Sequence, residues 1–256
     1  MNIAERIEHT CIDARATKAD ISNLCHEAKK YYFRSVCVNP EYSHLCKMKL
    51  HGTETKIVVV YNFPTSRSRE TRYADEIDVL IQARQCLTKQ GKRNIARQLE
   101  QAKKLRTIEG KPVKIVIETR VLTKKEIVYV SKMIAKYRLD YIKSSTGLYN
   151  RLYEQLYLQA KDKKAKALVG KMYSQDNFED LKLIKQGLKI FGIIPRKWLG
   201  LYVPKIKISG GIKYYKDAIK LIEQGADLLG ASKGVSMIIH QKTDEIVDRQ
   251  EERTKE

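Results

Sequence analysis

The chain has 256 residues, of which 43% are hydrophobic, and its 50 lysine and arginine residues outnumber 30 aspartate and glutamate residues to give a formal net charge of +20. This length fits one large α/β domain or two small domains, and the apolar content is sufficient for a sizeable core. Apolar residues occur along the whole chain while Gly and Pro number only 13 and 5, which excludes a disordered or fibrous protein.

The net charge allows two interpretations. A strongly basic protein can bind nucleic acid or an anionic membrane surface. The lysines are scattered along the chain, however, which favours a solvated basic surface. Nucleic acid or a membrane surface is then a secondary partner at most. The positive field would also attract a phosphorylated substrate.

The N-terminal segment and the cysteines bear on location. The N-terminus, Met-Asn-Ile-Ala-Glu-Arg, has no apolar stretch of signal-peptide length, and no run approaches the roughly 20 apolar residues needed to cross a bilayer. No C-x-x-C pair occurs among the five cysteines, which are Cys11, Cys25, Cys37, Cys46 and Cys86. Unpaired spacing of this kind favours reduced thiols over disulfides or a structural zinc site. We therefore expect a cytoplasmic protein without a bound metal.

Short runs rich in β-branched residues alternate with longer amphipathic segments along the chain, a pattern typical of repeated βα units. The eight candidate strands are Glu8–Ile12, Ser35–Val38, Lys56–Phe63, Glu76–Ile81, Val113–Glu118, Asp140–Lys143, Lys205–Ser209 and Asp227–Gly230. Eight such units predict an α/β fold in which a single (β/α)8 TIM barrel covers residues 1–240.

Three of the intervening segments have clear helix signals. Thr17 is a candidate N-cap for a helix over Lys18–Tyr31, whose apolar residues recur at three- and four-residue spacing. The Thr123–Tyr137 segment begins with a capping box completed by Glu126. A third helix is expected over Tyr214–Gln224, followed by a glycine C-cap.

Two segments depart from the regular spacing. Only eleven residues separate Phe63 from Asp75, so the helix after the third strand is shortened or absent. Leu148–Pro204 is far longer than one helix needs, and a Tyr- and Lys-rich stretch near 149–175 predicts an inserted amphipathic helix on the barrel rim or at a subunit contact. A lid and an RNA-contacting arm are the alternatives. Residues 241–256 are polar and read as a disordered tail.

Lysines occur where barrel strands should be apolar. In Lys205–Ser209 the period-two alternation turns the isoleucines outward and Lys207 into the barrel, and Lys143 stands opposite Ile142 at the end of its own strand. A second ammonium and a desolvated pocket both lower the pKa of a lysine, so that its neutral amine can attack a carbonyl. Asp78 could shuttle protons through water. Taken singly, each residue could instead form a strand-end salt bridge.

Two glycine-containing turns suggest a phosphate site. Gly210 and Gly211 follow the seventh candidate strand, and the sequence Gly230-Ala231-Ser232 stands at the end of the eighth. Glycine turns leave backbone N–H groups open to an anion, and the loops after these two strands often bind phosphate in such barrels. The sequence therefore predicts a phosphorylated small-molecule ligand.

Seven short segments of the chain match, in the same order, sequences that are typical of one known family. They are Ile7–Thr10, Ser35–Pro40, Asp75–Asp78, Val116–Thr119, Ile142–Gly147, Lys207–Ile212 and Gly230–Ser232. Together they resemble the deoxyribose-phosphate aldolase family, a family of class I aldolases, over roughly residues 3–239. The most specific are the Lys-Ser-Ser-Thr-Gly and Lys-x-Ser-Gly-Gly sequences.

The resemblance implies reversible cleavage of 2-deoxy-D-ribose 5-phosphate into D-glyceraldehyde 3-phosphate and acetaldehyde, with no metal or cofactor. Lys143 matches the family's Schiff-base lysine, Asp78 its proton-shuttling aspartate and Lys207 the second lysine that tunes the first. The phosphate-binding turns of the family are matched by Gly210, Gly211, Gly230 and Ser232. A homodimer is an open option.

The chain departs from the family's pattern at several positions. Glu8 stands where the family usually has aspartate, Asn62 replaces the glycine of a Gly-Phe-Pro sequence, and Leu148 follows Gly147 where some members carry a phosphate-facing lysine. The alternative to an aldolase is a catalytically weakened barrel that binds RNA or an anionic surface. A different Schiff-base sugar-phosphate aldolase is a further option.

Overall fold

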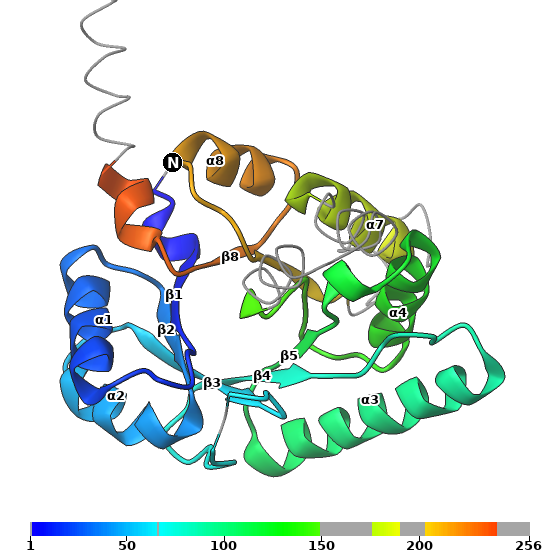
Figure 1. The fold of residues 1–256 in the computed structure, drawn as a ribbon, viewed down its shortest axis with the longest axis horizontal. Coiled ribbons are helices and arrows are strands. Elements are labelled where there is room, and N and C mark those ends of the chain that lie inside the picture. The colour runs from blue at the N-terminus through cyan, green and yellow to red at the C-terminus, as the bar shows by residue number, and fades with distance from the viewer. Residues whose placement is uncertain (1, 66, 149–175, 190–202, 240–256) are drawn as a thin grey trace, which may run out of the picture.

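The computed structural model describes residues 2–65, 67–148, 176–189 and 203–239 of the chain. Eight parallel strands form a closed barrel in sequence order, with β8 pairing back to β1 (Figure 1). The strands are β1 (Ile7–Cys11), β2 (Ser35–Val38), β3 (Lys56–Tyr61), β4 (Glu76–Leu80), β5 (Val113–Val116), β6 (Tyr141–Lys143), β7 (Lys205–Ser209) and β8 (Leu228–Ala231). The predicted (β/α)8 barrel is confirmed, with strand ends within two residues of the expected ones.

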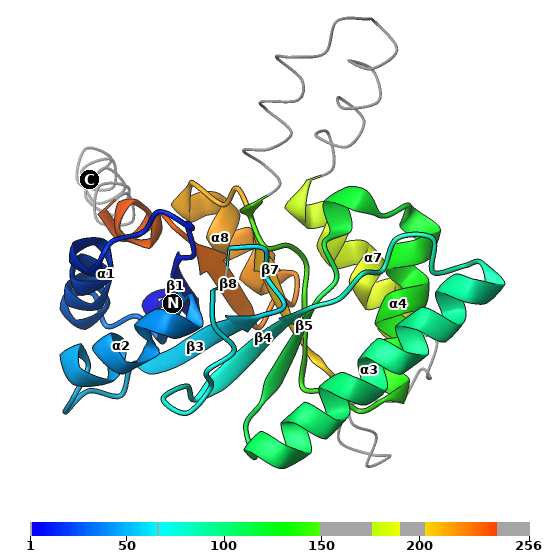
Figure 2. The same ribbon diagram turned by 60° about the horizontal axis from the view of Figure 1, so that its bottom comes forward.

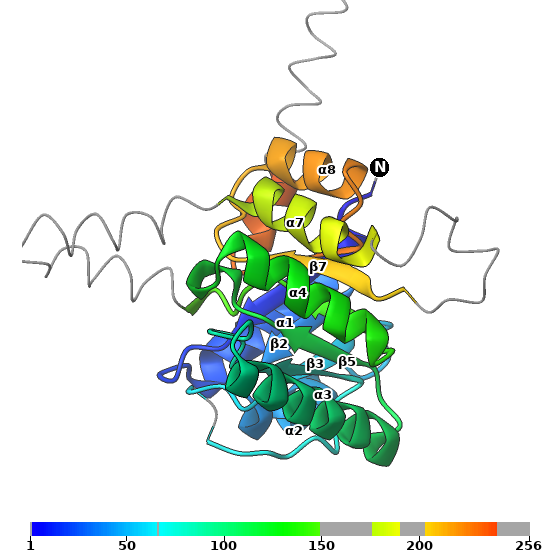
Figure 3. The same cartoon turned by 90° about the vertical axis from the view of Figure 1, so that its right-hand side faces the viewer.

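Helices surround the barrel. They include α1 (Lys18–Lys30), α2 (Ser43–Lys49), α3 (Lys89–Glu109), α4 (Lys124–Lys136), α7 (Asn177–Lys189) and α8 (Tyr215–Glu223), residues 234–239 are also helical, and short 3₁₀ turns occur at Ala4–Arg6, Pro40–Tyr42 and Thr119–Val121. Figure 2 shows α1 and α2 together on one side of the barrel and α3, α4 and α7 on the other. Figure 3 shows α4, α7 and α8 following one another around the outside.

Helix starts and stops follow local chemistry. The hydroxyl of Thr17 accepts the N–H of Asp20 at the start of α1, and Thr123 and Glu126 form the predicted capping box of α4. These bonds satisfy N–H groups that have no partner within the helix. The predicted third helix is α8, and Gly225 follows it with a left-handed φ of 103°, which glycine adopts without the steric cost of a Cβ.

The barrel is closed without a helix between β3 and β4. The described residues of the 62–75 connection contain none, as the spacing predicted, and Asn62 begins it at a φ of 62°, a left-handed conformation that asparagine tolerates well. The strands stay covered, because α2 packs against β3 and α3 against β5. Ile57 and Ile77 are accordingly buried among the helices.

Alternation along the strands divides the core into an outer layer and a lining. The outer layer is apolar and lies between strands and helices. Inside the barrel, one small apolar cluster consists of Ile12, Cys37, Val58, Val60, Phe63 and Val116. Other inward positions carry buried charged side chains, among them Asp78, Lys143 and Lys207, and these form the site described below.

Some expectations fall on parts of the chain outside the described residues. These are the inserted helix predicted near 149–175 and the polar tail predicted at 241–256. Between β6 and β7, α7 occupies the place of an ordinary crossover helix and packs on α4. Across the described ranges, no helix combines the length and the apolar character needed to span a membrane.

Candidate active site

The structure brings Lys143, Asp78 and Lys207 together inside the barrel. Their strands, β6, β4 and β7, turn all three side chains inward, and each is at most 1% exposed. The Lys143 Nζ donates a hydrogen bond to Asp78 Oδ2 at 2.6 Å, and the Lys207 Nζ donates to the same oxygen at 3.0 Å. One carboxylate oxygen therefore links the two amines.

A third buried lysine joins this cluster from β5. Lys114 is fully buried, and its Nζ lies 3.4 Å from Asp78 Oδ1, 3.3 Å from Glu8 Oε2 and 2.5 Å from Glu76 Oε2. Sequence reasoning missed this residue. Its signal was the same as that of Lys207, because Val113-Lys114-Ile115 places a charge between two outward apolar residues.

Acidic side chains from neighbouring strands balance these lysines. Glu8 ion-pairs with Lys207 through one oxygen, while the Ser35 hydroxyl donates to its other oxygen at 3.2 Å. Arg34 closes the cluster by donating to Glu76 Oε2 at 3.1 Å. Three lysines and one arginine thus meet three buried carboxylates, and each charge has opposite charges close by.

Burial has different net effects on the pKa values of Lys207 and Lys114. It lowers the pKa of Lys207 well below the ordinary value for lysine. Burial also opposes the charged form of Lys114, but the carboxylates of Asp78 and Glu76 outweigh it and raise the pKa of Lys114. Lys114 is therefore a permanent cation, while Lys207 gives up its proton more readily than a free lysine does.

Glu8, Cys37 and Asp78 offer ligand atoms close enough together to bind one metal ion. The surroundings do not suit a cation, because Lys114 and Lys207 already contact both carboxylates. Burial also raises the pKa of Cys37 to about 12, which keeps it a neutral thiol and a poor ligand. We assign no metal to this group.

Lowering the pH should reduce the free energy of unfolding, because it protonates the Glu76 carboxylate. Burial alone would raise the pKa of this carboxyl, but the charges of Lys114 and Arg34 outweigh it and lower the pKa to about 2. A carboxyl whose pKa is lower in the folded than in the unfolded state stabilises the fold at pH values above its unfolded-state pKa. This stabilisation is lost as the pH falls through the folded-state pKa. We expect Glu76 to contribute about 3 kcal/mol that disappears between about pH 4.5 and pH 2.

Urea unfolding of the wild type and Glu76→Gln at a series of pH values measures this contribution. The variant should lose less unfolding free energy than the wild type on acidification, whereas Glu54→Gln, at an exposed position, should follow the wild type. Parallel pH profiles for wild type and Glu76→Gln would contradict the assignment.

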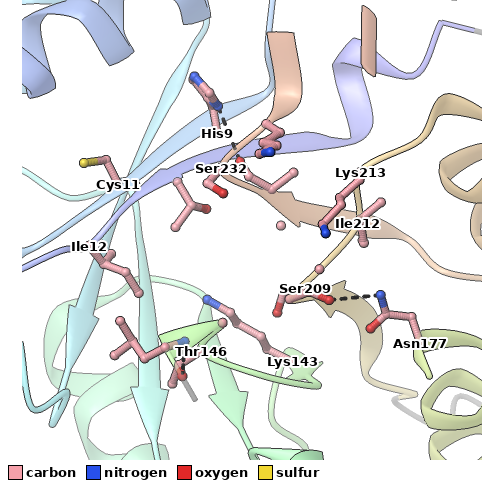
Figure 4. Close-up of a pocket in the computed structure, with 18 of the residues that line it drawn as sticks. His9, Cys11, Ile12, Lys143, Thr146, Asn177, Ser209, Ile212, Lys213 and Ser232 are labelled. Atoms are coloured by element: carbon pink, nitrogen blue, oxygen red, sulfur yellow. Dashed lines mark hydrogen bonds between the residues drawn. The ribbon is translucent and has the colours of Figure 1, made fainter. Parts of the chain in front are cut away.

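Above the cluster, a cavity of about 920 Å³ opens at the carboxyl ends of the strands. Lys143 lines it, whereas Asp78 and Lys207 do not. Figure 4 shows the Lys143 amine extending into the space between Ile12 and Ser209. Among the three clustered residues, Lys143 is thus the one that a ligand in the cavity can reach.

The loop after Lys143 is held by a buried carboxylate that sequence reasoning did not single out. Glu118 accepts hydrogen bonds from the Ser145 hydroxyl at 2.6 Å, the Thr146 hydroxyl at 2.6 Å and the Thr146 N–H at 3.0 Å. Burial raises the pKa of Glu118, although these bonds oppose that rise. The loop that carries Thr146 into the cavity wall is therefore fixed from below.

All four residues of the predicted phosphate turns line the same cavity. Gly210 and Gly211 have φ values of 94° and 77°, a left-handed pair that favours glycine. At Gly230 a Cβ would lie 2.8 Å from the Cβ of Ser209 and 3.0 Å from Lys207 Cε, so only glycine fits beside the buried lysine. Gly230 belongs to β8 itself rather than to the loop after it, and Ser232 is the first residue after that strand.

Comparison with known proteins gives the following relationships. No family model matches the chain. A deoxyribose-phosphate aldolase from Caldicellulosiruptor saccharolyticus is 33% identical over 251 residues, which cover 92% of this chain and 96% of that protein. A deoxyribose-phosphate aldolase from Clostridium tetani is 31% identical over 257 residues, with coverage of 94% and 100%.

A solved structure agrees at the level of the fold. The deoxyribose phosphate aldolase from Aeropyrum pernix superposes with a TM-score of 0.64 at 23% identity, covering 94% of this chain and 91% of that one. At 23% sequence identity this structural similarity supports the barrel architecture alone. The family relationship rests on the relatives that are more than 30% identical in sequence.

Proposed function

The chain belongs to the deoxyribose-phosphate aldolase family, and on that basis we propose how its site performs the family's reaction. The activity is that of a class I aldolase, a lyase that reversibly cleaves 2-deoxy-D-ribose 5-phosphate to D-glyceraldehyde 3-phosphate and acetaldehyde. The observation that carries the proposed mechanism is a lysine amine in a cavity, 2.6 Å from a buried carboxylate.

Lys143 forms the Schiff base. Asp78 Oδ2 accepts a proton from the Lys143 ammonium, which frees the amine to attack C1 of the open-chain aldehyde. The carbinolamine that results must lose its hydroxyl as water, and Asp78 returns the proton to that leaving group. The product is an iminium ion on Lys143, whose positive nitrogen draws electrons from the substrate chain.

Carbon–carbon cleavage follows from this electron demand. The C3 hydroxyl passes its proton through a water molecule to the Asp78 carboxylate, the C2–C3 bond breaks, and C3 becomes the aldehyde carbon of D-glyceraldehyde 3-phosphate. The bonding pair forms an enamine on Lys143. Protonation at C2 and addition of water then release acetaldehyde and restore the amine, so that the water lost in forming the Schiff base is replaced.

Lys207 and Lys114 support these steps from beneath the cavity. Lys207 shares Asp78 Oδ2 with Lys143 at 3.0 Å, and its lowered pKa lets it pass a proton to that oxygen and take one back. Lys114 holds the other oxygen of Asp78 at 3.4 Å, which orients the carboxylate. We assign Lys207 a proton-transfer role and Lys114 a positioning role.

The substrate's phosphate lies against the two glycine turns. Gly210 and Gly211 after β7, and Gly230 and Ser232 at the end of β8, line the cavity that contains Lys143. Glycine turns allow an anion to approach backbone N–H groups closely. This arrangement fixes the phosphate at one end of the sugar while C1 reaches the lysine.

We also propose a cytoplasmic location, supported by five free thiols, four of which are buried. A homodimer stays a prediction. The RNA- or surface-binding alternative depended on the segment near 149–175, which lies outside the described residues.

Two measurements on the wild type test the proposal. The protein should convert 2-deoxyribose 5-phosphate to glyceraldehyde 3-phosphate, detected by a coupled assay. Incubation with acetaldehyde and borohydride should add one ethyl group to the peptide that contains Lys143. A well-folded but inactive wild type would refute the activity, and ethylation at another lysine would refute the assignment of Lys143.

A further inference from the structure

Arg120 is a buried arginine in the wall of the cavity whose role the mechanism leaves open. It lies in the 3₁₀ turn that follows β5, is 8% exposed and lines the cavity with Lys143. Its Nη2 donates to Asn177 Oδ1 at a long 3.4 Å. Within the described part of the chain, its Nε has no hydrogen-bond acceptor and no carboxylate forms an ion pair with the guanidinium.

Nearby acidic groups are engaged elsewhere. Asp176, at the start of α7, accepts the N–H of Glu179 at 2.6 Å, and Asp180 accepts the hydroxyl of Thr119 at 2.7 Å. A buried guanidinium normally pairs with a carboxylate, because its planar set of donors is costly to desolvate without an acceptor. Arg120 therefore stands in the cavity wall with a donor that has no acceptor among the described residues.

Asn177 connects this arginine to the predicted phosphate turn. Its Nδ2 donates to the carbonyl oxygen of Gly210 at 3.0 Å, the bond drawn in Figure 4, while its Oδ1 faces Arg120. One side chain thus separates the guanidinium from the turn formed by Gly210 and Gly211. All of these residues line the same cavity, so the arginine and the turn face one ligand space.

We propose that Arg120 binds the phosphate of the substrate together with the Gly210–Gly211 turn, and so sets the preference of the enzyme for phosphorylated over unphosphorylated sugar. The turn supplies neutral N–H donors, and the arginine supplies a fixed charge whose planar donors suit phosphate oxygens. Leu148 also lines the cavity and offers no charge there. This inference rests on the proposed aldolase function.

Substrate preference tests the assignment directly. In Arg120→Gln, kcat/KM for 2-deoxyribose 5-phosphate should fall about 10- to 100-fold, the range expected for a lost charge-assisted hydrogen bond. The value for 2-deoxyribose, which has no phosphate, should stay close to that of the wild type. Arg97→Gln removes the same charge from the exposed face of α3 and should change neither value.

Phosphate binding gives a readout that does not depend on catalysis. Inorganic phosphate should raise the melting temperature of the wild type and of Arg97→Gln, and raise that of Arg120→Gln much less. Arg120→Lys keeps the charge without the planar donors and should give an intermediate shift. These measurements also apply if the wild type cleaves neither sugar, a result that would refute the proposed function alone.

Two outcomes would overturn the inference. Equal losses of kcat/KM on the phosphorylated and unphosphorylated sugars in Arg120→Gln would indicate a structural role for the arginine. Unchanged stabilisation of that variant by inorganic phosphate would show that the anion does not contact it.

Discussion

Replacing Lys143 with alanine is expected to lower kcat/KM for cleavage of 2-deoxyribose 5-phosphate by roughly 10⁴-fold or more, because the covalent intermediate can no longer form. No neighbouring amine can take over. Lys207 and Lys114 are fully buried and do not line the cavity, so their nitrogens cannot reach C1. Steady-state kinetics with the coupled assay measure the effect, and borohydride trapping of the variant should give no ethyl adduct.

The Lys143→Ala protein should fold, since Asp78 keeps its contacts with Lys207 and Lys114. Lys205→Ala serves as the matched control, because Lys205 is an exposed lysine on the adjacent strand β7 and should retain wild-type activity. Residual activity of Lys143→Ala within about tenfold of the wild type would exclude a Schiff base at this position.

Replacing Lys114 with methionine is expected to destabilise the barrel by about 3–5 kcal/mol, the range for removing one partner of a buried ion cluster. Methionine has a similar length, so the loss comes from charge rather than volume. Removing the Lys114 ammonium leaves three buried carboxylates, those of Glu8, Glu76 and Asp78, with fewer positive partners. Chemical unfolding monitored by circular dichroism measures the change.

A second substitution separates charge from packing at this site. Adding Glu76→Gln to Lys114→Met removes the carboxylate closest to the lysine and should recover part of the lost unfolding free energy. Lys103→Met, on the exposed face of α3, should leave stability within about 0.5 kcal/mol of the wild type. Lys114→Met with wild-type stability would show that the cluster does not depend on this charge.

The strands, the caps and three catalytic candidates could be predicted from local patterns alone. Thr17 and Thr123 carry their signal within three residues of sequence, and Lys143 and Lys207 stand out because charge interrupts apolar alternation. Lys114 interrupts apolar alternation in the same way, but a single lysine is hard to distinguish among the many lysines of a very basic chain.

The rest of the site depends on long-range packing. Glu118 lies at the end of β5 and takes its role from Ser145 and Thr146, which the barrel brings beside it. Arg120 looks like a solvated loop residue in the sequence, and only the position of α7 buries it against Asn177. The spacing of apolar residues along the sequence does not predict such contacts between distant segments.

The alternation that turns Asp78 inward also limits how the gene for such a barrel can change length. Deleting or inserting one residue within β4 would move Ile77 or Val79 into the buried charged cluster and turn the aspartate toward the helices. Loops have no such constraint, as the short connection after β3 and the long one before β7 illustrate. Descendants of this chain should therefore gain and lose residues between strands while each strand keeps its count.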